Sequence, residues 1–235
     1  MDFSKRSYEK ELLDRDDIPF EDIKQNMKEL DFINKYLGGH KITLNGFETI
    51  IATGKHTRER KIFVCEIGCG GGDNLRVLKT YCAKRNIPAE FSGVDINPNC
   101  IEFARSRIVN EGIQFFISDY KELTFEQAPD IIFCSLFCHH FTDDEVIGIL
   151  KWMKEHSTIG FFVNDLHRHR FAFYSIKWLT RFFSKSYLVK NDACLSVLRG
   201  FNRKELEQFC RHSLDQTFQL KWKWAFRWLL TWCHD

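Results

Sequence analysis

The chain lacks the features that mark several large classes of protein. Its 34 basic and 32 acidic residues leave a net charge of only +2, so no overall field draws it to nucleic acid or to a membrane surface. No apolar run is long enough to span a bilayer, and the stretch MDFSKRSYEKELLDRDD is too charged for a secretory signal. We therefore expect a cytoplasmic protein with neither a nucleic-acid partner nor integral membrane association.

The nine cysteines include no C-x-x-C pair, and the two C-x-x-x-C spacings are interrupted by strand and turn, which makes them poor zinc sites. Cys65, Cys69, Cys134 and Cys138 lie in or beside strand-like segments, where a small apolar side chain simply packs. The sequence therefore predicts neither a structural metal nor a disulfide framework, as is usual in a reducing cytoplasm.

The order of elements predicts an α/β fold, and 235 residues suit one domain of this kind. A helix is expected from Pro19 to the pair Gly38-Gly39. Strand-like runs then alternate with helical periodicity, which implies a parallel sheet with helical crossovers. In chain order we expect a strand from Ile62, a helix at 73–85, a strand at 90–95, a helix at 98–110, strands at 113–118 and 130–136, a helix capped by Thr142 with Glu145, a strand at 159–165, a helix from Asn202 and an antiparallel strand pair within 218–232.

The stretch Ile62–Leu75, IFVCEIGCGGGDNL, is a strand that enters a glycine turn at a helix N-terminus, where backbone amides can approach a small ligand. A dinucleotide fold requires G-x-G-x-x-G, but here Asp73 stands where that motif has its last small residue. Acidic residues on both sides of the turn suit a cationic or hydroxyl-rich ligand better than a diphosphate.

Glu66, Gly68, Gly70 and Gly72 match the E/D-x-G-x-G-x-G signature of motif I in class I S-adenosylmethionine-dependent methyltransferases, which the chain resembles over residues 62–165. More narrowly, it resembles the small-molecule, ubiquinone/menaquinone-type (methyltransferase type 11/12-like) group. The resemblance implies a Rossmann-like fold with a seven-stranded, mostly parallel sheet and a C-terminal antiparallel pair. It also implies a single domain over 1–235, with an N-terminal helical addition (1–58), a cofactor-binding core (59–165), a lid or substrate insertion (166–201) and a C-terminal helix and strands (202–235).

Polar residues end each of the first five expected strands, and ligands of open parallel sheets lie beyond that edge. Asp95 follows the glycines at about the interval from which an acid reaches ribose hydroxyls. By resemblance, Asp119 accepts from the adenine amino group while Tyr120 and Ile96 pack against the ring. The expected S-adenosyl-L-methionine-binding residues are Glu66, Gly68, Cys69, Gly70, Gly72, Asp73, Asn74, Asp95, Ile96, Asp119, Tyr120, Ser135 and Leu136.

Two histidines, His139 and His140, follow the fourth strand, where methyltransferases form the floor between cofactor and acceptor. A hydroxyl acceptor needs a base, and an imidazole titrates near neutral pH, so both histidines are catalytic candidates. Histidines at such strand ends can also be structural and donate to backbone carbonyls. The family resemblance slightly favours His140. After the fifth strand, Arg168 or His167 is expected to reach a polar substituent of the substrate.

The segment that follows offers two interpretations. Phe171, Tyr174, Trp178 and Phe182 share one helical face, which fits an aromatic lid over a flat substrate and equally an amphipathic helix packed on the domain. Such a strip could also track nucleic acid, but the low net charge and the absence of an N-P-P-Y-like tetrapeptide disfavour it. Asp192, Ser196 and Arg199 are expected at the rim of the site.

The sequence thus favours methylation of a phenolic or polyketide-like hydroxyl on a small, aromatic acceptor by a monomer or homodimer. Carbon methylation of a quinol-type ring is the close alternative. From other classes, a Rossmann-type nicotinamide oxidoreductase and a non-catalytic cofactor-binding protein remain open.

Overall fold

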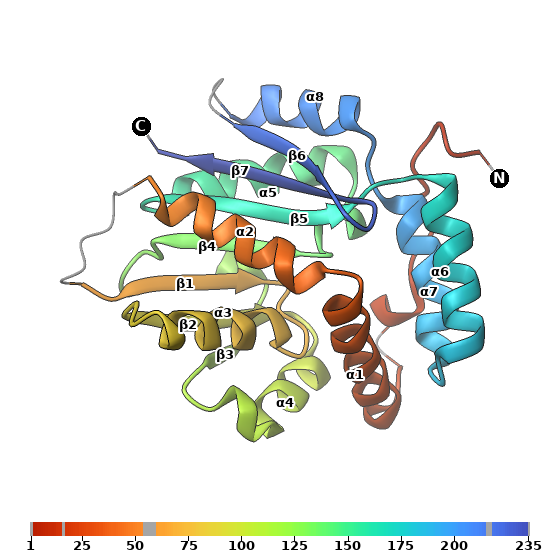
Figure 1. Ribbon diagram of the computed structural model, residues 1–235, viewed down its shortest axis with the longest axis horizontal. Helices are drawn as coiled ribbons and strands as arrows, with labels where there is room; N and C mark the ends of the chain where they lie inside the picture. Colours follow the sequence, from red (N-terminus) through yellow and green to blue (C-terminus); the bar gives the residue numbers. More distant parts are fainter. Residues whose placement is uncertain (1, 16, 54–59, 215–217, 235) are drawn as a thin grey trace.

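The computed structural model describes residues 2–15, 17–53, 60–214 and 218–234 (Figure 1). Within them, seven strands form one mixed sheet in the order β3-β2-β1-β4-β5-β7-β6. The first five strands run parallel to one another, whereas β7 is antiparallel to both β5 and β6. The expected fold class is therefore confirmed. The strands are β1 (Ile62–Ile67), β2 (Ala89–Asp95), β3 (Gln114–Ile117), β4 (Ile131–Ser135), β5 (Gly160–Leu166), β6 (Gln219–Lys223) and β7 (Arg227–Cys233).

Helices cover both faces of the sheet and its carboxyl-terminal edge. On one face lie α2, α3 and α4, on the other α5 and α8, while α6 and α7 stand beside the carboxyl ends of the parallel strands (Figure 1). The helices are α1 (Phe20–Tyr36), α2 (Gly39–Ile51), α3 (Asp73–Lys84), α4 (Pro98–Ser106), α5 (Asp143–His156), α6 (Arg170–Phe183), α7 (Tyr187–Arg199) and α8 (Arg203–Ser213). The described residues also form four single 3-10 turns, which are η1 (Leu12–Asp14), η2 (Ile108–Asn110), η3 (Tyr120–Glu122) and η4 (Cys138–His140).

The apolar residues of the central strands divide between two cores. In β1, Ile62 and Val64 pack toward α2 and α3, whereas Ile67 packs on the face covered by α5 and α8. All five residues of β4 are buried, as expected for a strand covered on both faces. Cys65, Cys69, Cys134 and Cys138 are buried free thiols, so they pack as small apolar residues.

Several boundaries differ from expectation. Gly38, at a φ of +79°, makes a turn after α1, but the chain then continues into α2, a helix that the sequence analysis did not recognise. The expected helix at 98–110 ends at Ser106, and η2 follows it. The proposed boundary between residues 58 and 59 lies outside the described residues. Among the described helices, none has the length and apolar character that crossing a bilayer would require.

Close packing of α2 on the sheet depends on a small residue. Gly46 faces the ring of Phe162 in β5, and a Cβ atom there would lie 2.5 Å from that ring. Gly148, by contrast, is an exposed helical glycine in α5, and a Cβ atom there would point into open space. The two glycines therefore form a matched pair, one needed for packing and one not.

We expect Gly46→Ala to lower the free energy of unfolding by about 1 kcal/mol or more, because overpacking outweighs the gain in helix propensity. Gly148→Ala should raise it by about 0.5–1 kcal/mol, since alanine is the better helix former. Urea denaturation of both variants measures this. An equal stabilisation by the two substitutions would contradict the close contact of α2 with Phe162.

Candidate functional site

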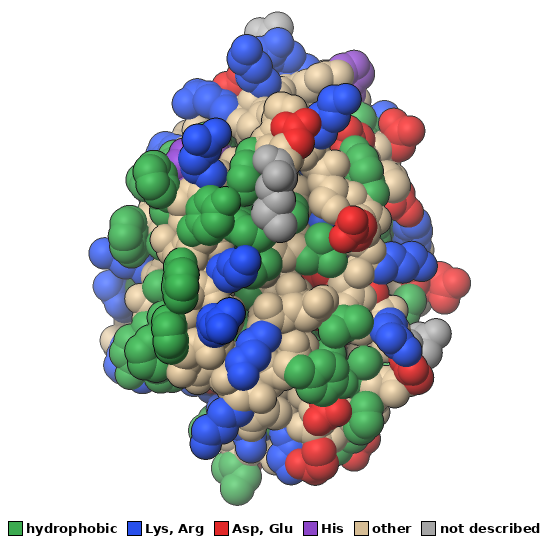
Figure 2. Space-filling model, turned by 90° about the vertical axis from the view of Figure 1, so that its right-hand side faces the viewer, with side chains coloured by type: hydrophobic (Ala, Val, Ile, Leu, Met, Phe, Trp, Pro, Cys, Tyr) green, Lys and Arg blue, Asp and Glu red, His purple; other side chains and the backbone are tan. Residues whose placement is uncertain are grey.

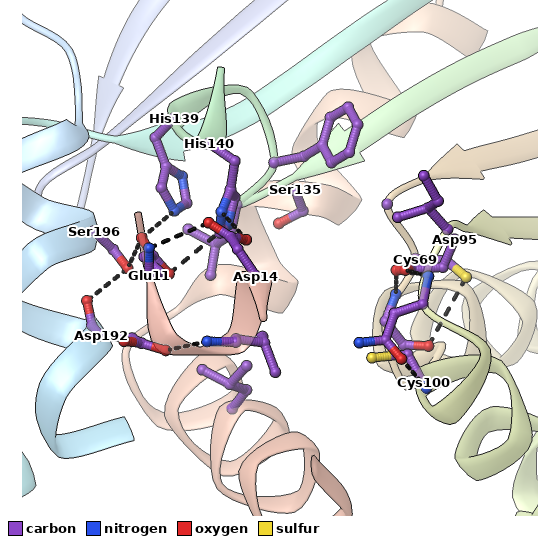
Figure 3. A pocket seen from close by; sticks show the side chains of 18 of the residues that line it. Glu11, Asp14, Cys69, Asp95, Cys100, Ser135, His139, His140, Asp192 and Ser196 are labelled. Carbon is purple, nitrogen blue, oxygen red and sulfur yellow. Dashed lines mark hydrogen bonds and ion pairs between the residues drawn. The ribbon is translucent and has the colours of Figure 1, made fainter. Parts of the chain in front are cut away.

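A cavity of about 920 Å³ opens at the carboxyl ends of the parallel strands. Its walls come from the N-terminal segment, α1, the glycine turn, the ends of β2 to β4, η4 and α7. In Figure 3, Cys69, Asp95 and Cys100 lie at one end, Glu11, Asp14, His139 and His140 at the other, and Ser135 between them. All expected cofactor residues except Gly72 line this cleft.

The glycine turn brings backbone amides to the first end of the cleft. Gly68 and Gly70 adopt φ values of +64° and +49°, a region that residues with a Cβ rarely enter. The Gly70 amide donates to Asp95 Oδ2 over 2.9 Å, which ties the turn to the end of β2. Gly72 does not line the cleft, but it allows close packing, because a Cβ there would lie 2.7 Å from the Phe115 ring.

Glu66 is a buried carboxyl with one unused oxygen. Its Oε1 accepts from Asn74 Nδ2 at 3.0 Å, whereas Oε2 has no hydrogen-bond partner among the described residues. Burial, followed by the charges of Asp73 and Asp95, raises the pKa of Glu66 well above its ordinary value. A buried acceptor without a partner is costly, so a ligand with a positively charged donor would relieve this position.

Asp95 and Asp119 also present carboxylates to the cleft. Asp95 accepts the amides of Gly70 and Asn97, each at 2.9 Å, and burial raises its pKa. Each carboxylate oxygen has capacity for a second donor. Asp119 caps η3 by accepting the amide of Lys121 at 3.0 Å, which leaves its other oxygen available. Ile96, 71% exposed beside Asp95, offers an apolar surface to a ligand.

Two expected contacts differ in detail. Tyr120 is buried, with its ring edge-on to Phe137 and Trp152, so only part of it faces the cleft. Asp73 lines the cleft but is already paired, since its Oδ2 lies 2.7 Å from His40 Nε2 and accepts from Asn34 at 3.2 Å. Burial alone would raise the pKa of Asp73, but the hydrogen bond and charge of His40 lower it.

Ser135 and Leu136 form the floor between the two ends. The Ser135 hydroxyl accepts from the buried Asn164 side chain at 3.0 Å. Leu136 adopts a φ of +55°, which is uncommon for a residue with a Cβ, and its amide donates to the Asn164 carbonyl at 2.9 Å. The end of β5 thus fixes the course of the chain out of β4.

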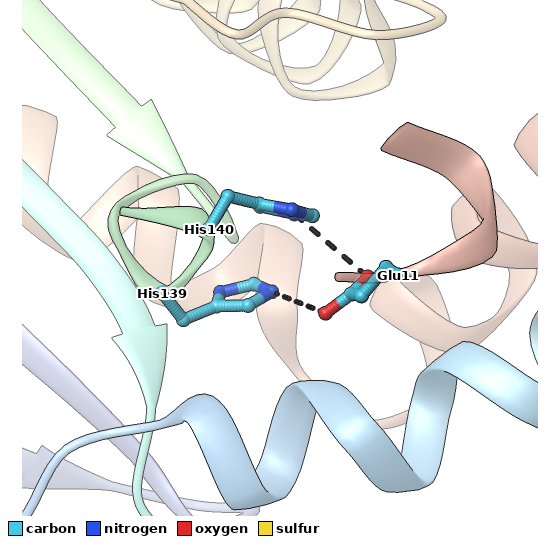
Figure 4. Close-up of side chains that lie close together, drawn as sticks. All are labelled: Glu11, His139 and His140. Atoms are coloured by element: carbon cyan, nitrogen blue, oxygen red, sulfur yellow. Dashed lines mark ion pairs between the residues drawn. The ribbon is translucent and has the colours of Figure 1, made fainter. Parts of the chain in front are cut away.

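A line of buried charges occupies the second end. His139 Nδ1 lies 2.7 Å from Asp165 Oδ1, and its Nε2 lies 3.5 Å from Glu11 Oε1 (Figure 4). Burial alone would lower the pKa of His139, but Asp165 and then Glu11 raise it to about 10. The raised pKa favours a protonated His139 at neutral pH, which does not fit the expected role of this residue as a base.

His140 is the more accessible histidine, with 21% of its side chain exposed. Its Nδ1 lies 3.0 Å from Asp14 Oδ1, and its Nε2 lies 3.9 Å from Glu11 Oε2, too far for a hydrogen bond. Burial would raise the pKa of Asp14, but the proximity and charge of His140 lower it. Asp14 is thus an ion-pair partner of the ring, although Nδ1 makes no hydrogen bond among the described residues.

The N-terminal segment closes this end because α7 holds it in place. Asp192 accepts the amides of Leu12 and Leu13 at 2.9 and 3.0 Å, and the Ser196 hydroxyl donates to Glu11 at 2.7 Å. Asp192 and Ser196 thus line the cleft as expected, but as supports of η1. Arg199 similarly donates to the His139 carbonyl at 2.9 Å.

The sequence analysis missed Glu11 and Asp14. They lie in a short charged stretch without periodicity, more than 120 residues from the histidines that they face. The three-residue spacing of the two acids is typical of a capping box and so indicates a local turn. It does not indicate that these acids contact His139 and His140.

The expected role of Arg168 is wrong in this structure. Its guanidinium is buried away from the cleft, where it pairs with Glu205 at 2.6 Å and donates to the carbonyls of Phe3 and Gly200. His167 accepts from Trp222 Nε1 at 3.2 Å. These side chains anchor the start of α6 to the N-terminal segment, α8 and β6.

Neither interpretation of the aromatic face of α6 is right. Phe171, Tyr174, Trp178 and Phe182 are between 50% and 68% exposed, so they neither cover the cleft nor pack on the domain. The inner face of α6 carries Ala172, Phe173 and Thr180 instead. It is α7, behind α6, that lines the cleft.

Two groups of potential metal ligands lie among the described residues. Glu11, His139 and His140 bring three ligand atoms within 4.8 Å of one another, and Asp31, His40 and Asp73 do the same. Neither group contains a cysteine. In both, a histidine already lies 2.7 Å from a carboxylate oxygen, which fits ion pairing.

Comparisons with known proteins agree with this geometry. Residues 64–160 match the family model described as a methyltransferase domain. No curated protein sequence gives a significant match.

Among solved structures, the plantazolicin methyltransferase BpumL, in complex with a triazolic desmethylPZN analog and SAH, is 19% identical with a TM-score of 0.61, over 86% of this chain and 72% of that one. Magnesium protoporphyrin IX methyltransferase from Synechocystis PCC 6803, with bound SAM, is 13% identical with a TM-score of 0.55, over 85% and 81%. Human N-acetylserotonin methyltransferase in complex with SAM is 15% identical with a TM-score of 0.62, over 92% and 56%. At these identities the likeness establishes the fold.

The buried charges of His139 and Asp165 lead to a pH prediction. Because the folded-state pKa of His139 is raised from 6.5 to about 10, the stabilisation gained by protonating His139 is fully present below about pH 6.5, as long as Asp165 is ionised, and is lost as pH rises through about 10. NMR of the imidazole, assigned with a His139→Gln variant, should show a charged ring at pH 8. Asp165→Asn should lower the midpoint of this titration. A ring that titrates near 6.5 in the unsubstituted protein would contradict the arrangement.

Proposed function

We propose that this class I methyltransferase transfers the methyl group of S-adenosyl-L-methionine to a hydroxyl of a small aromatic molecule, with His140 as the base. The domain family and the strand order support the methyltransferase assignment. The observation that carries the proposal is one cleft that has carboxyls around a glycine turn at one end and, at the other, a histidine paired with a carboxylate.

The first end suits the proposed cofactor. Glu66, with its unpartnered Oε2, would take the ammonium group, and Asp95 would accept from the ribose hydroxyls. Asp119 would accept from the adenine amino group, and Ile96 would pack against the ring. The cofactor supplies an electrophilic methyl group on a positively charged sulfur, and the acidic lining favours that charge.

The sheet argues against a nicotinamide oxidoreductase. The dinucleotide fold has strand order 3-2-1-4-5-6 and a small residue at the third position of its glycine motif. In this chain the antiparallel β7 lies between β5 and β6, and Asp73 occupies that position. Both departures favour a cofactor without a diphosphate.

At the second end, His140 would receive the acceptor proton on Nε2. Asp14 Oδ1 lies 3.0 Å from Nδ1, so the developing imidazolium would have an anionic partner. His139, already protonated, would position the neighbouring Glu11 and not act as a base. Alignment of acceptor and methyl group over Ser135, with water excluded, would supply much of the remaining rate acceleration.

The walls of the second end favour an aromatic acceptor. Phe141, Tyr8, Leu13 and Val189 line the cleft and belong to the segments that carry the charged groups of this end, whereas Phe137 packs against Gly68 and Tyr120. This mixture suits a flat ring that carries a hydroxyl. Oxygen methylation uses the histidine directly, and we therefore prefer it to carbon methylation of a quinol-type ring.

We expect Asp95→Ala to weaken S-adenosylmethionine binding more than about tenfold, since a buried carboxylate would lose its hydrogen bonds to the ribose. Isothermal titration calorimetry measures the affinity, and a thermal melt of the variant checks its fold. Asp144→Ala, at an exposed position of α5, is the control and should bind like the unsubstituted protein. Unchanged affinity in Asp95→Ala would refute the ribose assignment.

We expect His140→Ala to lower kcat by about 10²–10⁴-fold, the usual contribution of a general base, with little change in cofactor affinity. The assay follows a labelled methyl group from the cofactor onto phenols, quinols and polyketide-type products, and NMR of the product identifies the methylated atom. His212→Ala, an exposed histidine of α8 that bonds within its own helix, is the control. Equal losses of turnover and cofactor affinity would show that His140 is structural.

A further inference from the structure

Residues 166–191 contain no acidic side chain, although they lie between Asp165 and Asp192 in a chain with 32 acidic residues. One cation of this segment, Arg168, is buried against Glu205. The other cationic side chains are exposed. Arg170, Lys177 and Arg181 lie on α6, Lys185 follows it, and Lys190 lies in α7. The surface of this segment is therefore basic in a protein whose net charge is close to zero, and Glu29 of α1 reaches it only near the end of α6, where it accepts the amides of Lys185 and Ser186.

The same helix exposes a continuous row of large rings. Phe171, Tyr174, Trp178 and Phe182 are 66%, 50%, 58% and 68% exposed, and their spacing of three to four residues aligns them along the helix. The rings of Trp178 and Phe182 stack with centroids 5.7 Å apart. Single exposed apolar residues are ordinary, but a contiguous aromatic row on a folded domain marks an interaction surface.

Cations and rings form two adjacent stripes on α6. At 100° per residue, Arg170, Lys177 and Arg181 lie on one side of the row of rings, and the inner face of the helix packs on α7 and Phe3. Figure 2 looks onto the side of the molecule where α6 lies and shows hydrophobic side chains in a column beside Lys and Arg. Most acidic side chains in that view lie away from the column.

We propose that α6 is a peripheral docking surface for an anionic lipid membrane. Its rings would enter the interface between headgroups and acyl chains, and its lysines and arginines would lie against lipid phosphates. A helix with rings on one stripe, cations on the next and no acidic residue has the composition of interfacial membrane helices. The surface is local, which is why the net charge does not reveal it.

The stripes fit a bilayer better than two other partners. Nucleic acid would need a groove that follows its backbone, whereas these rings lie on the convex outer side of a helix. A second copy of α6 would place cations opposite a surface without acidic residues, and like charges at an interface are unfavourable. A lipid surface satisfies both stripes at once.

Membrane docking would also bring the cleft close to the bilayer. α7 packs against α6 on one side and lines the cleft on the other. The second end of the cleft, which holds His139 and His140, would then be separated from the lipid by one helix. This would give an apolar ligand a short path from the membrane. The docking proposal does not depend on which reaction the cleft performs.

Flotation of the full chain with lipid vesicles tests the proposal. Vesicles of equal parts phosphatidylglycerol and phosphatidylcholine should bind the protein, and pure phosphatidylcholine should bind it at least about tenfold more weakly. Trp178→Ser with Phe182→Ser should reduce binding to anionic vesicles at least about tenfold, because the inserted rings are lost. Lys177→Glu with Arg181→Glu should do the same, and high salt should weaken binding.

The matched control is Lys84→Glu with Lys151→Glu, which changes net charge equally at exposed positions of α3 and α5. It should bind anionic vesicles nearly as well as the unsubstituted chain, and thermal melts should show that all variants fold. Equal weakening by the control pair, or no binding to anionic vesicles, would overturn the proposal. So would a dimer in analytical ultracentrifugation that the Trp178 and Phe182 substitutions dissociate.

Discussion

The structure depends on a buried line of charge that joins β5, η4 and the N-terminal segment. Asp165, His139 and Glu11 are between 1% and 4% exposed, and such groups can be buried only when each has a partner. The imidazolium of His139 satisfies a carboxylate on either side. The N-terminal segment must therefore return to the sheet edge, and Ser196 of α7 follows because it supports Glu11. One wall of the cleft is a consequence of this pairing.

The two ends of the cleft solve different electrostatic problems. At the glycine turn, neither Glu66 nor Asp95 has an ion-pair partner among the described residues, and burial raises the pKa of both carboxyls. A positively charged ligand would lower these pKa values. At the other end, acids and histidines already compensate one another, and Asp14 is the ion-pair partner of His140. The cleft thus combines a site prepared for a cation with a site prepared for proton transfer.

Local patterns predicted the sheet well, because strand ends, glycine turns and caps are encoded by neighbouring residues. The capping box of Thr142 and Glu145 is of this kind. The pairings of Glu11 with His139 and of Arg168 with Glu205 are not, since no periodicity connects such distant positions. The aromatic row on α6 was recognised as a helical face, but a helical period does not reveal whether that face meets protein or solvent. α2 was missed because Gly38-Gly39 marks a turn without excluding a second helix after it.

A crystal structure of the chain with S-adenosyl-L-homocysteine and the methylated product tests the central claim most directly. The account predicts the cofactor product between Glu66, Asp95 and Asp119, its sulfur above Ser135, and the methylated oxygen within hydrogen-bond reach of His140. Binding of the cofactor product outside the glycine turn, or of the acceptor at a distance from His140, would contradict it.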